Sequence, residues 1–286
     1  MKQFLILLLL LMTFSMVGKA QITVPTQAEL EQFVKTKTII MLEANPLRVF
    51  NEQMRVTADK HWKITPYEFM TYNDKLFDSL RTDPNLSFLI LDATYFKRDK
   101  ILTKYQFLNV SLGGNYATVK EMPTISGLPI SYADVDEGTY DYKLGLILQF
   151  IESHVHNLIA NPQIKSSSKA LKFYSDNMKQ IHNKTLYVLE EELTKEVNTL
   201  KKIKEFYPYP VKIATAEEIE AVIDSKDKNA VILHQVAPGK DHKKVRCWNT
   251  ILGADDAALY YFNWFFIKKG KRAEGFSEKD FKKLSK

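Results

Sequence analysis

The sequence contains almost no cysteine: Cys247 is the only one in 286 residues. A single cysteine excludes an internal disulfide and every Cys-x-x-Cys redox or zinc motif. The fold must therefore be held by apolar burial, which the composition permits, since 45% of the residues are hydrophobic and 12% are aromatic. Cys247 lies in an alternating run, 245–248, and we expect it to pack as a small apolar residue.

Long apolar runs are also lacking, except at the amino terminus. The chain opens MKQFLILLLLLMTFSMVGKA, with basic Lys2, an apolar stretch at 4–12 and small residues near 18–20. This pattern is typical of a cleaved export signal, and an uncleaved amino-terminal anchor is the alternative. We therefore expect a mature protein that does not span the membrane and that lies in the periplasm, in the outer envelope or outside the cell.

Neither sign of charge dominates. The formal net charge of +6 falls to +4 without the leader, which contains Lys2 and Lys19 and no acid. Short basic runs such as 268–272 are not interleaved with aromatic residues in a nucleic-acid-binding pattern. We expect solvated loops and no nucleic-acid partner; a weak footprint for phosphate-bearing lipid or polysaccharide is the alternative.

The sequence also lacks the motifs of common enzymes: no phosphate loop, dinucleotide fingerprint, nucleophile elbow or zincin motif occurs. Gly113-Gly114 is not followed by the lysine and hydroxyl residue of a phosphate loop, so it predicts a turn. His154 and His156 are two residues apart on a predicted helix and face nearly opposite sides, which disfavours a shared metal ion. The sequence therefore predicts neither a cofactor nor a metal.

What the sequence does contain is an internal echo. KTIIMLE at 37–43 resembles KTLYVLE at 184–190. Three further pairs match: TPYEF at 65–69 with TAEEI at 215–219, SFLIL at 87–91 with AVILH at 230–234, and NVSLGG at 109–114 with NTILGA at 249–254. Because the four matches occur in one order, they favour a duplicated unit over coincidence. TPYEF and TAEEI both have the pattern of a capping box that begins a helix.

Each copy predicts the order β-α-β-α-β-β followed by a closing helix, an α/β (mixed α+β) fold in which each mixed sheet has a parallel core. In the second copy, a helix is expected to carry Leu193, Val197 and Leu200 on one stripe. The closing helix of the first copy, 140–160, has so broad an apolar surface that we expect it to be buried on two sides, between the copies.

The predicted domain organisation follows from the echo and from the polar segment after Asn161-Pro162. It consists of a signal peptide at 1–20, a first repeat at 21–160, a linker with a bridging helix at 161–183 and a second repeat at 184–286.

Candidate site residues lie at the carboxyl ends of the parallel strands, where ligands of such sheets bind. These ends carry Glu43 and Asp92 in the first copy and Glu190 and His234 in the second. A glutamate that faces a histidine can act as a base with an orienting partner, or can hold a polar ligand. Strand ends are also polar for solvation alone, and we favour ligand binding over catalysis.

A second candidate surface is the aromatic run at 260–265. Its alternation predicts a strand, and core packing explains about half of its side chains. We name Tyr261 and Trp264 as candidates for an interaction surface, because an exposed aromatic patch favours a protein, glycan or lipid partner.

The strings KITPYEF, VDEGTYDYKLG and ILGADDAALYYF resemble segments of uncharacterised exported proteins of Bacteroidetes-type bacteria, over nearly the whole mature chain. The resemblance implies an envelope address and brings no known activity or catalytic residue. The sequence thus predicts an exported, non-catalytic binding or interaction module. The alternative is a small-molecule hydrolase that uses Glu190 and His234.

Overall fold

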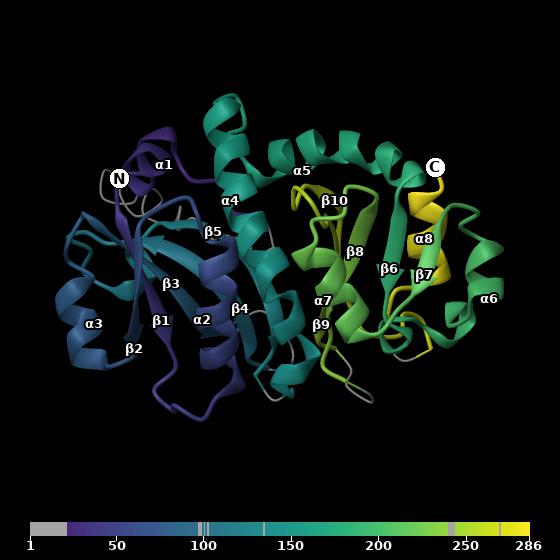
Figure 1. The fold of residues 1–286 in the computed structure, drawn as a ribbon, viewed down its shortest axis with the longest axis horizontal. Coiled ribbons are helices and arrows are strands. Elements are labelled where there is room, and N and C mark those ends of the chain that lie inside the picture. The colour runs from purple at the N-terminus through teal and green to yellow at the C-terminus, as the bar shows by residue number, and fades with distance from the viewer. Residues whose placement is uncertain are drawn as a thin grey trace, which may run out of the picture.

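The computed structural model describes residues 22–286 except 97, 98, 100, 102, 134, 240–243 and 269. The predicted signal peptide therefore lies outside the described residues. Two five-stranded sheets stand side by side, with helices between them and at both ends (Figure 1). Within the described ranges, no helix is long and apolar enough to cross a membrane.

The first unit contains β1 (Lys37–Leu42), β2 (Tyr67–Thr71), β3 (Leu86–Thr94), β4 (Tyr105–Leu112) and β5 (Thr124–Tyr132). Its helices are α1 (Gln27–Phe33), α2 (Val49–His61), α3 (Asp74–Leu80) and α4 (Leu144–Ala160), with 3-10 turns η1 (Val119–Glu121), η2 (Glu137–Thr139) and η3 (Asp141–Lys143). The strand order is β2-β1-β3-β4-β5. The first three strands are parallel, and β4 and β5 add an antiparallel hairpin.

The second unit contains β6 (Thr185–Val188), β7 (Val211–Ile213), β8 (Ala230–Val236), β9 (Arg246–Gly253) and β10 (Leu259–Phe266). Its helical elements are η5 (Glu190–Glu192), η6 (Lys195–Val197), α6 (Leu200–Lys204), α7 (Ala216–Asp224) and α8 (Glu278–Leu284), and α5 (Ser167–Ser175) and η4 (Asp176–Asn183) link the units. The strand order β7-β6-β8-β9-β10 repeats that of the first unit, with the same parallel and antiparallel pairs. The predicted fold class and its two mixed-sheet repeats are confirmed.

Only one of the two predicted capping boxes forms. Thr215 caps α7, and the side chains of Thr215 and Glu218 each accept a hydrogen bond from the other residue's backbone N–H. The prediction for the first copy is wrong, because the segment after Thr65 pairs with β1 as strand β2, and α3 begins only after Asn73. Thr65 is buried instead, and its hydroxyl accepts a hydrogen bond from the Trp62 indole at 3.0 Å.

The helices cover both sheets in the same pattern. In the first unit, α2 and α4 pack on the sheet face that carries Ile40 and Leu89, and α3 packs on the opposite face through Phe77. In the second unit, α6 and α8 share one face, and α7 packs on the other, which carries Tyr187. The heptapeptide echo matches Ile40 with Tyr187. Ile40 lies on the face that α2 and α4 cover, whereas Tyr187 lies on the face opposite their counterparts α6 and α8, so residues matched by the echo lie on opposite faces of the repeated fold. Strand order and helix placement carry the repeat, rather than the residue-by-residue matches.

Helix α4 lies at the centre of the molecule (Figure 1). Every residue from 144 to 151 is buried, and the helix contacts α1 and α2 on one side and α7 on the other. Gly145 permits this approach, because a Cβ there would lie 2.8 Å from the His61 ring of α2. The largest core cluster therefore crosses from the first unit into the second, as the broad apolar stripe predicted.

Buried ion pairs also join the two units. The guanidinium of Arg246 on β9 donates to Asp99 at 2.7–3.1 Å, and Asp99 accepts a further hydrogen bond from the Tyr105 hydroxyl at 3.0 Å. Lys143 of η3 contacts Glu192 of η5 at 2.5 Å. These side chains are almost fully enclosed, so loss of one partner would leave an uncompensated charge in the interior.

The segment after β6 is less regular than predicted. Leu193 and Val197 are buried, but Leu200 is exposed, and two short pieces, η6 and α6, replace the expected helix. The reason is a backbone exchange with the carboxyl-terminal segment: Phe276 N–H donates to the Glu192 carbonyl, and the Phe276 carbonyl accepts from Thr194. These bonds replace helical ones, and they draw the Phe276 ring into the second core.

Candidate ligand pocket

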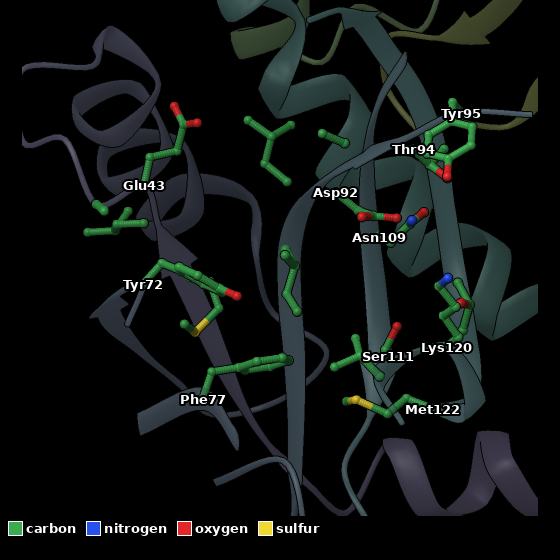
Figure 2. A pocket seen from close by; sticks show the side chains of 18 residues that line it. Glu43, Tyr72, Phe77, Asp92, Thr94, Tyr95, Asn109, Ser111, Lys120 and Met122 are labelled. Carbon is green, nitrogen blue, oxygen red and sulfur yellow. The ribbon is translucent and has the colours of Figure 1, made fainter. Parts of the chain in front are cut away.

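A cavity of about 740 Å³ lies on the α3 face of the first sheet, beside the carboxyl ends of β1 and β3. Glu43 and Asp92, two of the four predicted ligand-binding residues, line it (Figure 2). The strand-end rule thus brings these two side chains to one cavity, although their role as ligands stays a prediction.

The polar floor of the cavity arises from strand alternation. On β4, Val110 and Leu112 face the core, so Asn109 and Ser111 face the cavity next to β3. Sequence reasoning missed Asn109 and Ser111. The available signal was the alternation Asn-Val-Ser-Leu, which predicts one polar face on an otherwise apolar strand.

A glycine makes room for the Asn109 side chain. Gly127 of β5 pairs with Asn109. A Cβ on Gly127 would lie 2.1 Å from Asn109 Oδ1, which no real contact permits. The amide therefore occupies space that any other residue at 127 would fill.

Asp92 is the uncompensated acid of the cavity. Its carboxylate has no hydrogen-bond or ion-pair partner among the described residues, and solvent reaches it. The walls of the cavity displace part of its hydration, and this desolvation raises the pKa of Asp92 above its ordinary value. A carboxylate that is partly stripped of water and lacks a cation favours a positively charged or hydrogen-bonding ligand.

Glu43 differs from Asp92 because a cation accompanies it. Glu43 Oε2 lies 2.8 Å from Arg48 Nε, and Arg48 also contacts Glu137. Desolvation raises the pKa of Glu43; Glu137 adds to this effect, and Arg48 opposes it. The charge of Glu43 is thus already partly neutralised by Arg48, and Asp92 is the acid that can form an ion pair with a ligand.

The other walls are mainly apolar. Phe77 and Met122 lie at one end of the cavity, and Thr94 and Tyr95 at the other (Figure 2). Phe77 and Met122 belong to a small buried cluster under α3. Lys120, from the turn η1, lines the same cavity. The site therefore combines two carboxylates, one lysine, neutral hydrogen-bonding groups and an apolar end.

Glu190 and His234 do not form a catalytic pair of the predicted kind. No hydrogen bond joins them among the described residues, and Glu190 is exposed whereas His234 is 1% exposed. His234 Nε2 donates to the Pro129 carbonyl at 2.9 Å. Burial, with a contribution from Lys143, lowers the pKa of His234 to about 3, so the ring is neutral. The acid that turns inward after β6 is Glu192, two residues beyond the predicted one.

The aromatic candidates are mostly enclosed. Tyr261 is buried, and its hydroxyl donates to Asp280 at 2.8 Å. Trp264 is half-buried, with the Arg246 guanidinium 4.7 Å from its ring centroid and Phe266 packed edge-on against it. Tyr261 is therefore a core residue, and only part of Trp264 is accessible to a partner.

A metal centre has no support in the part of the chain that the structure describes, where no three His, Cys, Asp or Glu side chains are grouped to hold an ion. Cys247 is fully buried, and this burial raises the pKa of its thiol, which keeps it protonated.

The architecture is thus that of a two-unit mixed α/β protein with a cavity on the outer face of its first sheet. Comparisons with family models, with curated proteins and with solved structures found no match to this chain.

Proposed function

We propose that this protein is an exported binding protein of the bacterial envelope, which holds a small polar ligand in the cavity of the first sheet without transforming it. The observation that carries the proposal is the convergence of Asp92, Asn109 and Ser111 on a cavity of about 740 Å³ with mainly apolar walls. Small-molecule sites have this size, and they combine apolar walls with a few placed polar groups.

Binding is favoured over catalysis by the state of the two acids. A hydrolytic pair of carboxylates needs one acid and one base that are both free to exchange protons with a substrate. Glu43 is engaged by Arg48, so Asp92 alone is available for that work. The predicted hydrolase residues, Glu190 and His234, do not line the cavity.

Export is supported by the leader pattern described above. The contacts of the first described residue are compatible with removal of that leader. Ile22 is 2% exposed, and its carbonyl accepts a hydrogen bond from Ser167 at 2.6 Å. Cleavage after residue 20 would leave these contacts intact. Amino-terminal sequencing of protein from the periplasm of an expressing bacterium should give Gln21, and an intact Met1 would contradict cleavage.

The ligand site is tested by a thermal-shift screen of mature protein against amino acids, peptides, sugars and nucleotides. A true ligand at 100 times its Kd adds about 2.7 kcal/mol of stability, which raises Tm by roughly 5 °C or more. Ser111→Trp fills the cavity and should abolish the shift. Ser225→Trp, at an exposed position after α7, should retain it. No shift from any class, or a shift that survives Ser111→Trp, would contradict the proposal.

A further inference from the structure

We propose that the ligand is a zwitterion with an apolar side chain, an amino acid or dipeptide, whose ammonium group binds Asp92 and whose carboxylate binds Lys120. The inference rests on the proposed function of the cavity and names the chemistry that the cavity selects.

The first element of this recognition is Asp92. Its carboxylate faces the cavity from β3 and has no cationic partner among the described residues, whereas Glu43 on the neighbouring strand has Arg48. An ammonium group would supply the missing counter-charge and the hydrogen-bond donors that an ionised carboxylate accepts. The reduced hydration of Asp92 strengthens such a pair relative to one in open water.

The second element is Lys120. It lines the cavity from η1 and forms no ion pair or side-chain hydrogen bond with any described residue. Asp92 and Lys120 do not pair with each other, so the cavity holds separated charges of opposite sign. A ligand with two charges of the same sign would be repelled by either Asp92 or Lys120. A ligand with one positive and one negative end matches both residues.

The third element is the apolar end. Phe77 and Met122 lie away from the Asp92 rim in Figure 2 and pack with Met41 in the cluster beneath α3. An aliphatic or aromatic side chain placed here loses contact with water, and this burial of apolar surface favours binding. Asn109 and Ser111 lie on the floor, where they can hydrogen-bond a peptide group.

The test uses isothermal titration of mature protein with matched probes. L-Phenylalanine and leucyl-phenylalanine carry all three features; phenethylamine lacks the carboxylate, 3-phenylpropionate lacks the ammonium group, and glycine lacks the side chain. At least one of the two complete probes should bind tenfold or more tightly than each incomplete probe. Maltose, a neutral sugar, serves as a ligand of another class.

Two variants assign the charges. Asp92→Asn should lower the affinity for the complete probe at least tenfold and leave the weak binding of 3-phenylpropionate unchanged. Lys120→Gln should also lower the affinity for the complete probe at least tenfold, but it should leave the weak binding of phenethylamine unchanged. Lys75→Gln, at an exposed position on α3 outside the cavity lining, is the matched control and should bind as the parent protein does. Unchanged binding in either charge variant would overturn the assignment.

The remaining outcomes separate this inference from the proposed function. Maltose binding that is lost in Ser111→Trp, with no binding of either zwitterion, overturns the zwitterion and leaves the cavity as a binding site. Equal affinity for phenylalanine and phenethylamine overturns the role of the carboxylate, and with it the zwitterion. Binding that Ser111→Trp does not weaken overturns both.

Discussion

The two units share a strand order, but they bury their sheets differently. Every residue of β9 is buried, and Gln235 is the one exception on β8. On β4, by contrast, buried and half-buried residues alternate, and β3 becomes exposed at Asp92 and Ala93. One topology therefore supports two outcomes: in the second unit the central strands β8 and β9 are covered on both faces, and in the first unit β3 and β4 leave part of one face to solvent.

The cause of the difference lies in what covers each face. The second sheet has α6, α8 and Phe276 on one face, and α7 with the neighbouring α4 on the other. Among the described residues, α3 and the segment around Met122 cover one end of the outer face of the first sheet. Polar side chains are placed where the cover stops. A face released from core packing is free to carry groups that serve a ligand.

The largest expected effect comes from matched phenylalanines on the two covering helices. Phe281→Ala in α8 removes a fully buried ring from the filled second unit and should cost about 3–5 kcal/mol of unfolding free energy. Phe77→Ala in α3 enlarges a space that already opens to water, and we expect about half that loss. Urea unfolding measures both, and equal losses would remove the difference between the units.

The junction should be more sensitive than the surface. Arg246→Met strands the buried Asp99 carboxylate and should cost about 3–5 kcal/mol. Adding Asp99→Leu should recover most of this loss, because the uncompensated charge is then gone. Glu68→Gln breaks the exposed pair with Lys37 and should cost under about 1 kcal/mol. A loss in Arg246→Met no greater than that of Glu68→Gln would show that the buried pair does not hold the units together.

A histidine sharpens the comparison through pH. His154 on α4 is enclosed; its Nδ1 accepts from the Tyr174 hydroxyl at 2.7 Å, and its Nε2 donates to the Thr23 carbonyl at 2.6 Å. Burial lowers the pKa of His154 to about 4. The stability tied to the neutral ring is complete above the ordinary pKa of 6.5 and is lost as the pH falls towards 4.

This loss amounts to about 3 kcal/mol for His154. His154→Gln should therefore show a shallower fall in unfolding free energy between pH 7 and pH 4 than the parent protein does. His156→Gln, at an exposed position on the same helix, is the matched control and should keep the parent slope. Identical slopes in the two variants would show that His154 is not held neutral.

The smallest expected effect lies in the open face itself. Asp92→Asn removes a carboxylate whose pKa is raised by desolvation, so it should stabilise the protein at pH 7. The gain should stay under about 1 kcal/mol, because solvent still screens this exposed group. Since the raised pKa penalises only the charged form, the gain should vanish at pH 3. A lower thermal midpoint for Asp92→Asn at pH 7 would mean that the carboxylate has a structural partner.

Several features were predictable from the sequence for identifiable reasons. The central parallel strands β1 and β6 are apolar on both faces, so parallel sheets with helices on both sides followed from the pattern at 39–42 and 186–189. Helix α4 has apolar side chains around most of its circumference, which required two buried sides. The strand-end rule placed Glu43 and Asp92 at one cavity because neighbouring parallel strands end at the same edge.

Other features depended on contacts distant in sequence. The segment TPYEF has the residues of a helix start, but pairing with β1 makes it a strand. The alternation along β4 marks Asn109 and Ser111 as one polar face, but only the register of β4 beside β3 shows that this face borders the cavity. Glu192, rather than Glu190, turns inward because a 3-10 turn follows β6 and because Lys143 of the first unit forms a buried ion pair with it. No local pattern carries that information.

The shared helix α4 has a consequence for the order in which the protein is made. Whether the chain emerges from the ribosome or from an export channel, the first unit emerges before α7 does, and folding generally proceeds from the amino-terminal domain onward. Until residues 216–224 arrive, the side of α4 that they cover has no neighbour. The incomplete chain therefore exposes an apolar surface of α4 to solvent. We expect a fragment that ends near residue 166 to aggregate unless a chaperone covers this surface.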